Sequence, residues 1–113
     1  MPRAWTYRVQ DILTSIERIQ RYTAGMSYEA FCADEKTVDA VILNLAIVGE
    51  AARHIPSEIE AAWPGVPWQE MRGIRNVLIH GYFGIDLAIV WQTVTHDLPP
   101  LIPILTELLE SAD

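Results

Sequence analysis

Residues 35–54 form the segment that most constrains how this chain can fold. Two apolar stripes run along it at helical spacing, one made of Val38, Val41, Ile42, Leu45 and Ala52, the other of Ala40, Leu43, Ile47 and Ala51. A helix that is apolar on nearly every side is normally buried all round. Because the chain has only 113 residues, we expect neighbouring helices to cover most of this segment and a second subunit to cover the rest.

The other segments also have helical patterns. A first helix is expected over residues 5–23, where Val9, Ile12, Leu13, Ile16 and Ile19 recur at the spacing of one helical face, and Gly25 ends it. Ser27 is expected to cap a short turn at residues 28–32, and Asp34 to cap the helix 35–54.

The second half of the chain continues in the same way. We expect a capping box at residues 57–60, a helix 67–79 that begins with Pro67 and ends before Gly81, and a helix 87–97 capped by Asp86. Pro99 and Pro100 precede a last helix whose inward positions are Leu101, Ile104, Leu105 and Leu108. The sequence therefore predicts an all-α protein, one domain over residues 1–113, with four to five main helices in an antiparallel bundle.

Composition narrows the class of protein. Half the residues are apolar, which excludes general disorder. No apolar run approaches the ~20 residues of a membrane span, and the start of the chain lacks the apolar core of a signal peptide. We therefore expect a cytoplasmic protein without a membrane partner. Cys32 is the single cysteine and is read as a small apolar group at a helix edge.

No metal or cofactor is expected, because His54, His80 and His96 are too scattered for a zinc site. A net charge of −7 argues against broad, non-specific binding of nucleic acid. If the helices 35–54 and 67–79 pack together, Arg53 and Arg72 could join Arg75 in a small basic cleft. Such a cleft suits a selective site or a protein partner.

The segment 71–82 carries the side chains best suited to phosphate chemistry. Arg75 is a permanent, fork-shaped cation, and His80 can exchange a proton near neutral pH. Asn76 and the Tyr82 phenol add hydrogen-bonding groups. At ~100° per residue, positions 75 and 80 differ by ~140° around one helix. They can converge only if the chain turns at Gly81, or if the site is shared across a symmetric dimer.

Each of these residues also has an ordinary structural role. Arg75 could form a salt bridge with Glu50 or Glu70, and His80 could bond the last carbonyls of its helix. Tyr82 could pack its ring with the hydroxyl at the surface. The joint spacing of the group, more than any one member, favours a functional site.

The segment 75–82, with the sequence RNVLIHGY, resembles the R-N-x-x-x-H-x-Y motif of HEPN-domain proteins, specifically the HepT toxins of HepT/MntA toxin–antitoxin pairs. The segments 47–52 (IVGEAA), 66–68 (VPW) and 98–101 (LPPL) are similar to this group in order and spacing. The resemblance thus covers nearly the whole chain.

This resemblance implies a dimeric, all-helical, metal-independent endoribonuclease that acts on RNA. It implies that Arg75 and His80 are catalytic. We expect Asn76 to support them, and Glu50 either to orient Arg75 or to restrain it by charge pairing. It also implies an MntA-like nucleotidyltransferase antitoxin as partner, which transfers AMP to Tyr82. Two alternatives stay open at this point, a non-catalytic helical adaptor for such a partner and a purely structural dimer.

Overall fold

The computed structural model describes residues 4–80 and 84–112, without the side chains at positions 75–77, 79 and 80. All regular structure in these ranges is helical, which confirms the all-α prediction. The elements are α1 (Trp5–Thr23), α2 (Tyr28–Ala33), α3 (Glu35–Ala52), α4 (Ser57–Ala62), α5 (Trp68–His80), α6 (Leu87–Gln92), the π-helical segment η1 (Thr93–Asp97) and α7 (Leu101–Ser111).

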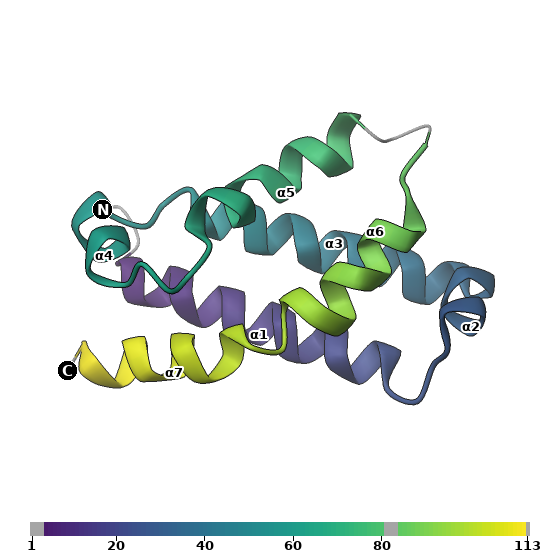
Figure 1. Cartoon of the computed structure of the whole chain (residues 1–113), viewed down its shortest axis with the longest axis horizontal. Helices are drawn as coiled ribbons and strands as arrows, with labels where there is room; N and C mark the ends of the chain where they lie inside the picture. The colour runs from purple at the N-terminus through teal and green to yellow at the C-terminus, as the bar shows by residue number, and fades with distance from the viewer. Residues whose placement is uncertain (1–3, 81–83, 113) are drawn as a thin grey trace.

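The core lies between α1 and α3, two antiparallel helices joined at one end by the short α2 (Figure 1). Val9, Ile12, Ile16 and Ile19 of α1 are fully buried, as predicted from their spacing. Val41 and Val48 of α3 are buried to the same extent. The α5 helix packs on α3 and α7 packs on α1, so that these four helices lie side by side (Figure 1).

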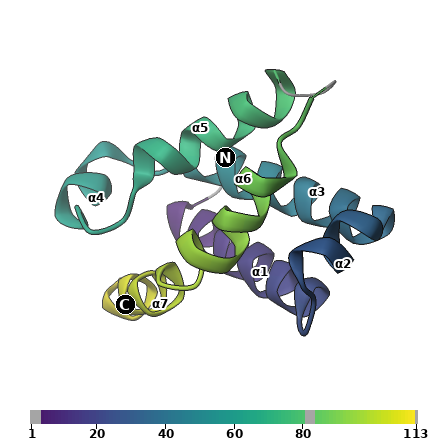
Figure 2. The ribbon, with the colours of Figure 1, turned by 45° about the vertical axis from the view of Figure 1, so that its right-hand side comes forward.

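The helix α6 crosses this layer on one side, as a comparison of Figure 1 with Figure 2 shows. It is attached to α2 through ring contacts of Trp91, whose centroid lies 5.0 Å from that of Phe31 and 6.4 Å from that of Tyr28. Phe31 itself is fully buried. This contact ties the end of the first helical hairpin to the segment that follows α5.

Three predicted caps are present. The side chain of Ser27 accepts a hydrogen bond from the Ala30 amide, and that of Asp34 accepts one from the Thr37 amide. Asp86 accepts hydrogen bonds from the amides of Ala88 and Ile89. Gly25 has φ of +75°, a left-handed conformation that glycine adopts without strain, and follows the end of α1 as predicted.

The predicted capping box at residues 57–60 is wrong. The carbonyl of Pro56 accepts hydrogen bonds from the amides of Ile59 and Glu60, so Pro56 is the N-cap of α4. Proline has no side-chain group that could cap the helix. Ser57 becomes the first residue of α4, one position too late to cap it. Similarly, the Pro67 carbonyl accepts a hydrogen bond from the Met71 amide. Pro67 therefore directly precedes α5, whereas the sequence predicted it as the first residue of the helix.

The ends of two other helices also differ from expectation. The helix predicted over residues 35–54 ends at Ala52, because the amides of Arg53 and His54 bond three residues back in a tight last turn. The helix predicted over 87–97 has the expected extent, but its second half is π-helical. The Leu98 amide donates a hydrogen bond of 2.9 Å to the Thr93 carbonyl, five residues earlier.

The α3 helix is not buried on all sides within one chain. Leu43 is 62% exposed, and Ala40 and Ile47 on the same side are half-buried. The residual apolar face that the sequence predicted is therefore present on the monomer. Among the described residues, none of the helices combines the length and apolar character needed to cross a membrane.

We predict that the Asp34 cap makes stability depend on pH. The hydrogen bond from the Thr37 amide lowers the pKa of Asp34 below its ordinary value. A carboxyl with a lowered folded-state pKa stabilises the fold above its unfolded pKa, and this contribution is lost as the pH falls below about 4. In urea unfolding between pH 6 and pH 3, Asp34→Asn should keep the cap but lose part of this pH dependence. An unchanged pH slope in that variant would contradict the assignment.

Candidate active site

The helix α5 carries most of the residues of the candidate site. Positions 75, 76 and 80 lie in its second half, and the helix ends at His80, directly before Gly81. The side chains of Arg75, Asn76 and His80, and the whole of Tyr82, lie outside the described residues. Their individual roles therefore stay predictions, while the helix that presents them is part of the structure.

The backbone of α5 limits how the site can be built. It is helical through both position 75 and position 80. Five residues along a regular helix turn the direction of a side chain by ~140°. A change of direction at Gly81 comes after His80 and cannot bring these two positions onto one face of α5. Of the two arrangements that the sequence left open, a turn at Gly81 therefore receives no support from the helix, and a site shared between two chains stays a prediction.

Glu50 lies in the last turn of α3, the helix on which α5 packs. One carboxylate oxygen is 3.5 Å from Nη1 of Arg53, and the other is 3.3 Å from Nε2 of His54. All three side chains are about half exposed. Glu50 is thus accessible at the surface and has the cation of Arg53 beside it, directly after the end of α3. Its predicted contact with Arg75 involves a side chain outside the described residues.

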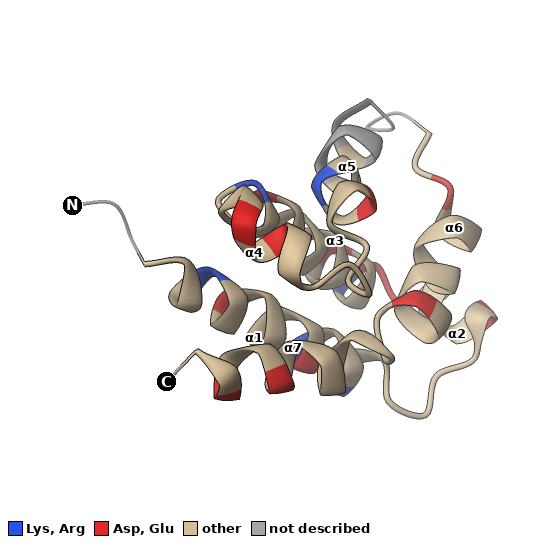
Figure 3. Ribbon diagram, turned by 60° about the vertical axis from the view of Figure 1, so that its left-hand side comes forward, with Lys and Arg blue, Asp and Glu red and all other residues tan. Residues whose placement is uncertain are grey.

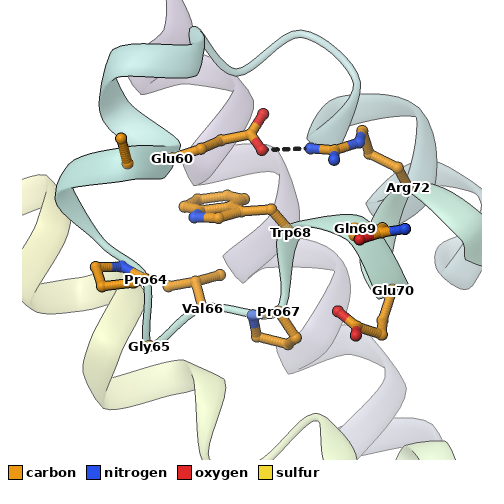
Figure 4. Close-up of a pocket in the computed structure, with 10 residues that line it drawn as sticks. Glu60, Pro64, Gly65, Val66, Pro67, Trp68, Gln69, Glu70 and Arg72 are labelled. Atoms are coloured by element: carbon orange, nitrogen blue, oxygen red, sulfur yellow. Dashed lines mark hydrogen bonds and ion pairs between the residues drawn. The ribbon is translucent and has the colours of Figure 1, made fainter.

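Arg72 is held by an acid from another helix. Its guanidinium forms a salt bridge with Glu60 of α4, and Figure 4 shows this pair beside Trp68 at the edge of an open pocket of about 570 Å³. Trp68 is buried and donates a hydrogen bond from Nε1 to the carbonyl of Trp63 at 3.0 Å. These contacts fix the first turn of α5 against the loop before it.

The pocket in Figure 4 belongs to this junction and lies at the opposite end of α5 from His80. His80 is twelve residues beyond Trp68, which at 1.5 Å per residue corresponds to ~18 Å along the helix. The pocket is therefore a depression where α4, its loop and α5 meet. The start of α5 is anchored, and the second half of the helix carries positions 75 and 80.

The expected basic cleft is weaker than the sequence predicted. Arg53 lies against Glu50, and Arg72 lies against Glu60, so both cations have a carboxylate beside them. Figure 3 shows positions of Lys and Arg interspersed with positions of Asp and Glu along the described part of the chain. A phosphate at the site would therefore depend on the cation at position 75 more than on a cluster of three arginines.

Sequence reasoning missed His54 and the anchor of α5. His54 was set aside as an isolated histidine, although its spacing of four from Glu50 on one helix could have linked the two. The pairing of Glu60 with Arg72 joins residues on either side of a loop, where helical periodicity gives no signal.

Cys32 also differs from expectation. It was read as a small apolar group, but it is exposed on α2. A hydrogen bond with the Cys32 side chain raises the pKa of Tyr28 above its ordinary value, and partial burial adds to this shift. No group of three or more possible metal ligands occurs within the described ranges.

Comparison with known proteins places the chain in one family. A sequence model of the family described as ribonuclease HepT-like matches residues 12–108. The Thermococcus cleftensis protein named "Probable ribonuclease HepT" is 42% identical over 89% of this chain and 92% of its own length. The Methanocaldococcus jannaschii protein named "Putative RNase MJ1380" is 42% identical over 80% of this chain and 84% of its own. No solved structure matches the chain significantly.

Proposed function

The chain belongs to the family of HepT-like ribonucleases, and from this membership we propose that it is the toxin of a toxin–antitoxin pair. It cleaves RNA without a metal ion, at a site that two copies of the chain form together. Arg75 and His80 are the proposed catalytic residues. The observation that carries the proposal is the placement of these two positions on the second half of α5, with position 80 as the last residue of the helix.

Metal-free cleavage of RNA needs three groups. A base removes the proton from the 2′-hydroxyl, whose oxygen attacks phosphorus and forms a 2′,3′-cyclic phosphate while the bond to the 5′-oxygen breaks. An acid protonates that leaving oxygen, and a cation stabilises the charge on the phosphoryl oxygens. His80 suits the first two roles and Arg75 the third. Asn76 and Glu50 are proposed to support them.

The division of these roles favours a dimer. One chain supplies a single His80, whereas the reaction uses both a base and an acid. Two chains related by a two-fold axis supply two imidazoles and two guanidinium groups to one cleft. The exposed apolar face of α3 around Leu43 supports this arrangement, because α3 is the helix on which α5 packs.

We predict that Arg75→Ala and His80→Ala each reduce RNA cleavage in EDTA by at least about 10²-fold. The measurement is single-turnover cleavage of a mixed RNA, with helicity checked by circular dichroism. Arg72→Gln is the matched control. It removes an arginine one turn earlier on the same helix, but one that pairs with Glu60.

The control should keep most of the activity and lose at most about 1 kcal/mol of stability, because the salt bridge is partly exposed. If Arg75→Ala and His80→Ala cleave as fast as the wild type, the catalytic proposal is wrong. A folded, inactive wild-type protein that still binds a nucleotidyltransferase would instead favour an adaptor.

Leu43→Glu should convert the dimer into a folded monomer. A carboxylate on the exposed apolar face of α3 would have to be buried without a partner in the dimer, which is strongly unfavourable. Sedimentation velocity gives the mass, and cleavage should fall together with dimer content. Ser57→Glu on α4, also at an exposed position, is the control for added charge. A Leu43→Glu protein that remains dimeric would exclude this face as the interface.

We further propose that a cognate MntA-like nucleotidyltransferase neutralises the toxin by transferring AMP to Tyr82. The transfer forms an ester between the phenol oxygen and the α-phosphate of ATP, and pyrophosphate leaves. Tyr82 follows His80 by two residues. The attached phosphate would compete with RNA for Arg75, and the nucleotide would occupy space in the cleft.

Co-expression with a nucleotidyltransferase encoded beside this gene should raise the intact mass of the protein by the mass of one AMP group. Tyr82→Phe should abolish the increase, because it lacks the phenol oxygen that accepts the nucleotide. Tyr22→Phe, which removes another exposed phenol on α1, should not change it. An AMP adduct that persists in Tyr82→Phe would move the modification to another residue.

A further inference from the structure

A groove runs along α5 on the side that faces α6 and η1. It consists of two adjoining hollows of about 630 and 330 Å³, which share Glu70, Ile74 and Thr93. The larger hollow reaches the start of α7, and the smaller one reaches Leu78 near the end of α5. The two together follow α5 over most of its length.

The floor of the groove is apolar. It contains Met71, Ile74 and Leu78 from α5, Leu45 from α3 and Leu101 from α7. Ile89 stands at its edge on α6 and is 56% exposed, which is unusual for a large aliphatic side chain. An apolar floor with an exposed apolar edge is typical of a surface that receives the apolar face of a helix.

The rim of the groove is acidic. Glu70 and Asp97 line it from opposite sides, and both are exposed. Among the described residues that line the two hollows, none is Lys or Arg. An RNA phosphate is repelled by these carboxylates. A second copy of this chain, with its own net charge of −7, also lacks the complementary charge. The occupant that fits has apolar side chains flanked by Lys or Arg.

The π-helical segment contributes to the shape of this surface. Thr93, His96 and Asp97 of η1 all line the larger hollow. A π turn inside a helix is uncommon and is often found at functional sites. The groove is thus bordered by η1, the one π-helical element among the described residues.

We propose that this groove is the docking site for a basic helix of the protein partner, whose apolar side chains lie on the floor between α5 and α6. The inference rests on the proposed function, since the partner that tests it is the nucleotidyltransferase. Leu78 in the groove precedes Tyr82 by four residues. A partner bound here would therefore be held next to the segment that it modifies.

The test is binding of the purified nucleotidyltransferase, encoded beside this gene, to the full chain by isothermal titration calorimetry. Ile89→Glu should weaken binding by more than about tenfold, because it places a carboxylate on an apolar contact. Glu70→Lys should weaken it on the order of tenfold by reversing a rim charge. Glu17→Lys, an exposed acid on α1 outside the groove, makes the same charge change and should leave binding unaltered.

The same variants are measured for mass by sedimentation and for RNA cleavage without the partner. The groove is supported as the docking site if the wild type binds the partner and Ile89→Glu does not, while this variant still forms the dimer and cleaves RNA. If all variants bind the partner equally well, the groove is not the docking site, whereas the proposed function is unaffected. Loss of the dimer would assign the groove to a second copy, and loss of cleavage would assign it to RNA. Absence of wild-type binding would overturn the proposed partner as well.

Discussion

The packing of α1 against α3 is the contact on which the rest of the structure depends. Fully buried aliphatic side chains from both helices meet there, with Val9 and Ile16 on one side and Val41 and Val48 on the other. Burial of such side chains is the main favourable term in folding. Because α3 uses one face for α1 and a neighbouring face for α5, the position of the motif helix is set by the core. The uncovered side of α3, around Leu43, remains for a further contact.

The α5 helix connects this core to the chemistry. Its first turn is fixed by buried Trp68 and by the salt bridge between Arg72 and Glu60, while positions 75 and 80 lie toward its other end. A helix held in this way presents side chains at defined angles, and positions 75 and 80 are separated by ~140° around it. If these two positions form the catalytic pair, as we propose, their separation is a physical reason for pairing two chains.

The features that could be predicted from the sequence are those set by interactions between residues close together in the chain. Both ends of α1 and the Asp86 cap were predictable, because apolar spacing, glycine and a capping carboxylate act within a few residues. Ser57 has the right spacing to Glu60 for a capping box, but the carbonyl of Pro56 begins the helix one residue earlier. The π turn at η1 and the pairing of Arg72 with Glu60 depend on tertiary contacts. Position 75 was placed on a helix correctly, and position 80, expected one residue beyond that helix, is its last residue. The meeting of the two positions across a second chain stays a prediction, because no periodicity describes it.

The acidity of the chain is consistent with cleavage of RNA once Arg53 and Arg72, the two arginines expected beside position 75, are considered. Arg53 and Arg72 each have a carboxylate within salt-bridge distance, which reduces their attraction for phosphate. Non-specific affinity for RNA grows with the number of free cations that contact the backbone. A ribonuclease with few such cations holds RNA weakly outside its cleft, so its selectivity depends on the groups at the catalytic centre. The same excess of carboxylates attracts a basic protein. Low affinity for bulk RNA and attraction of the proposed basic partner would therefore have one electrostatic origin.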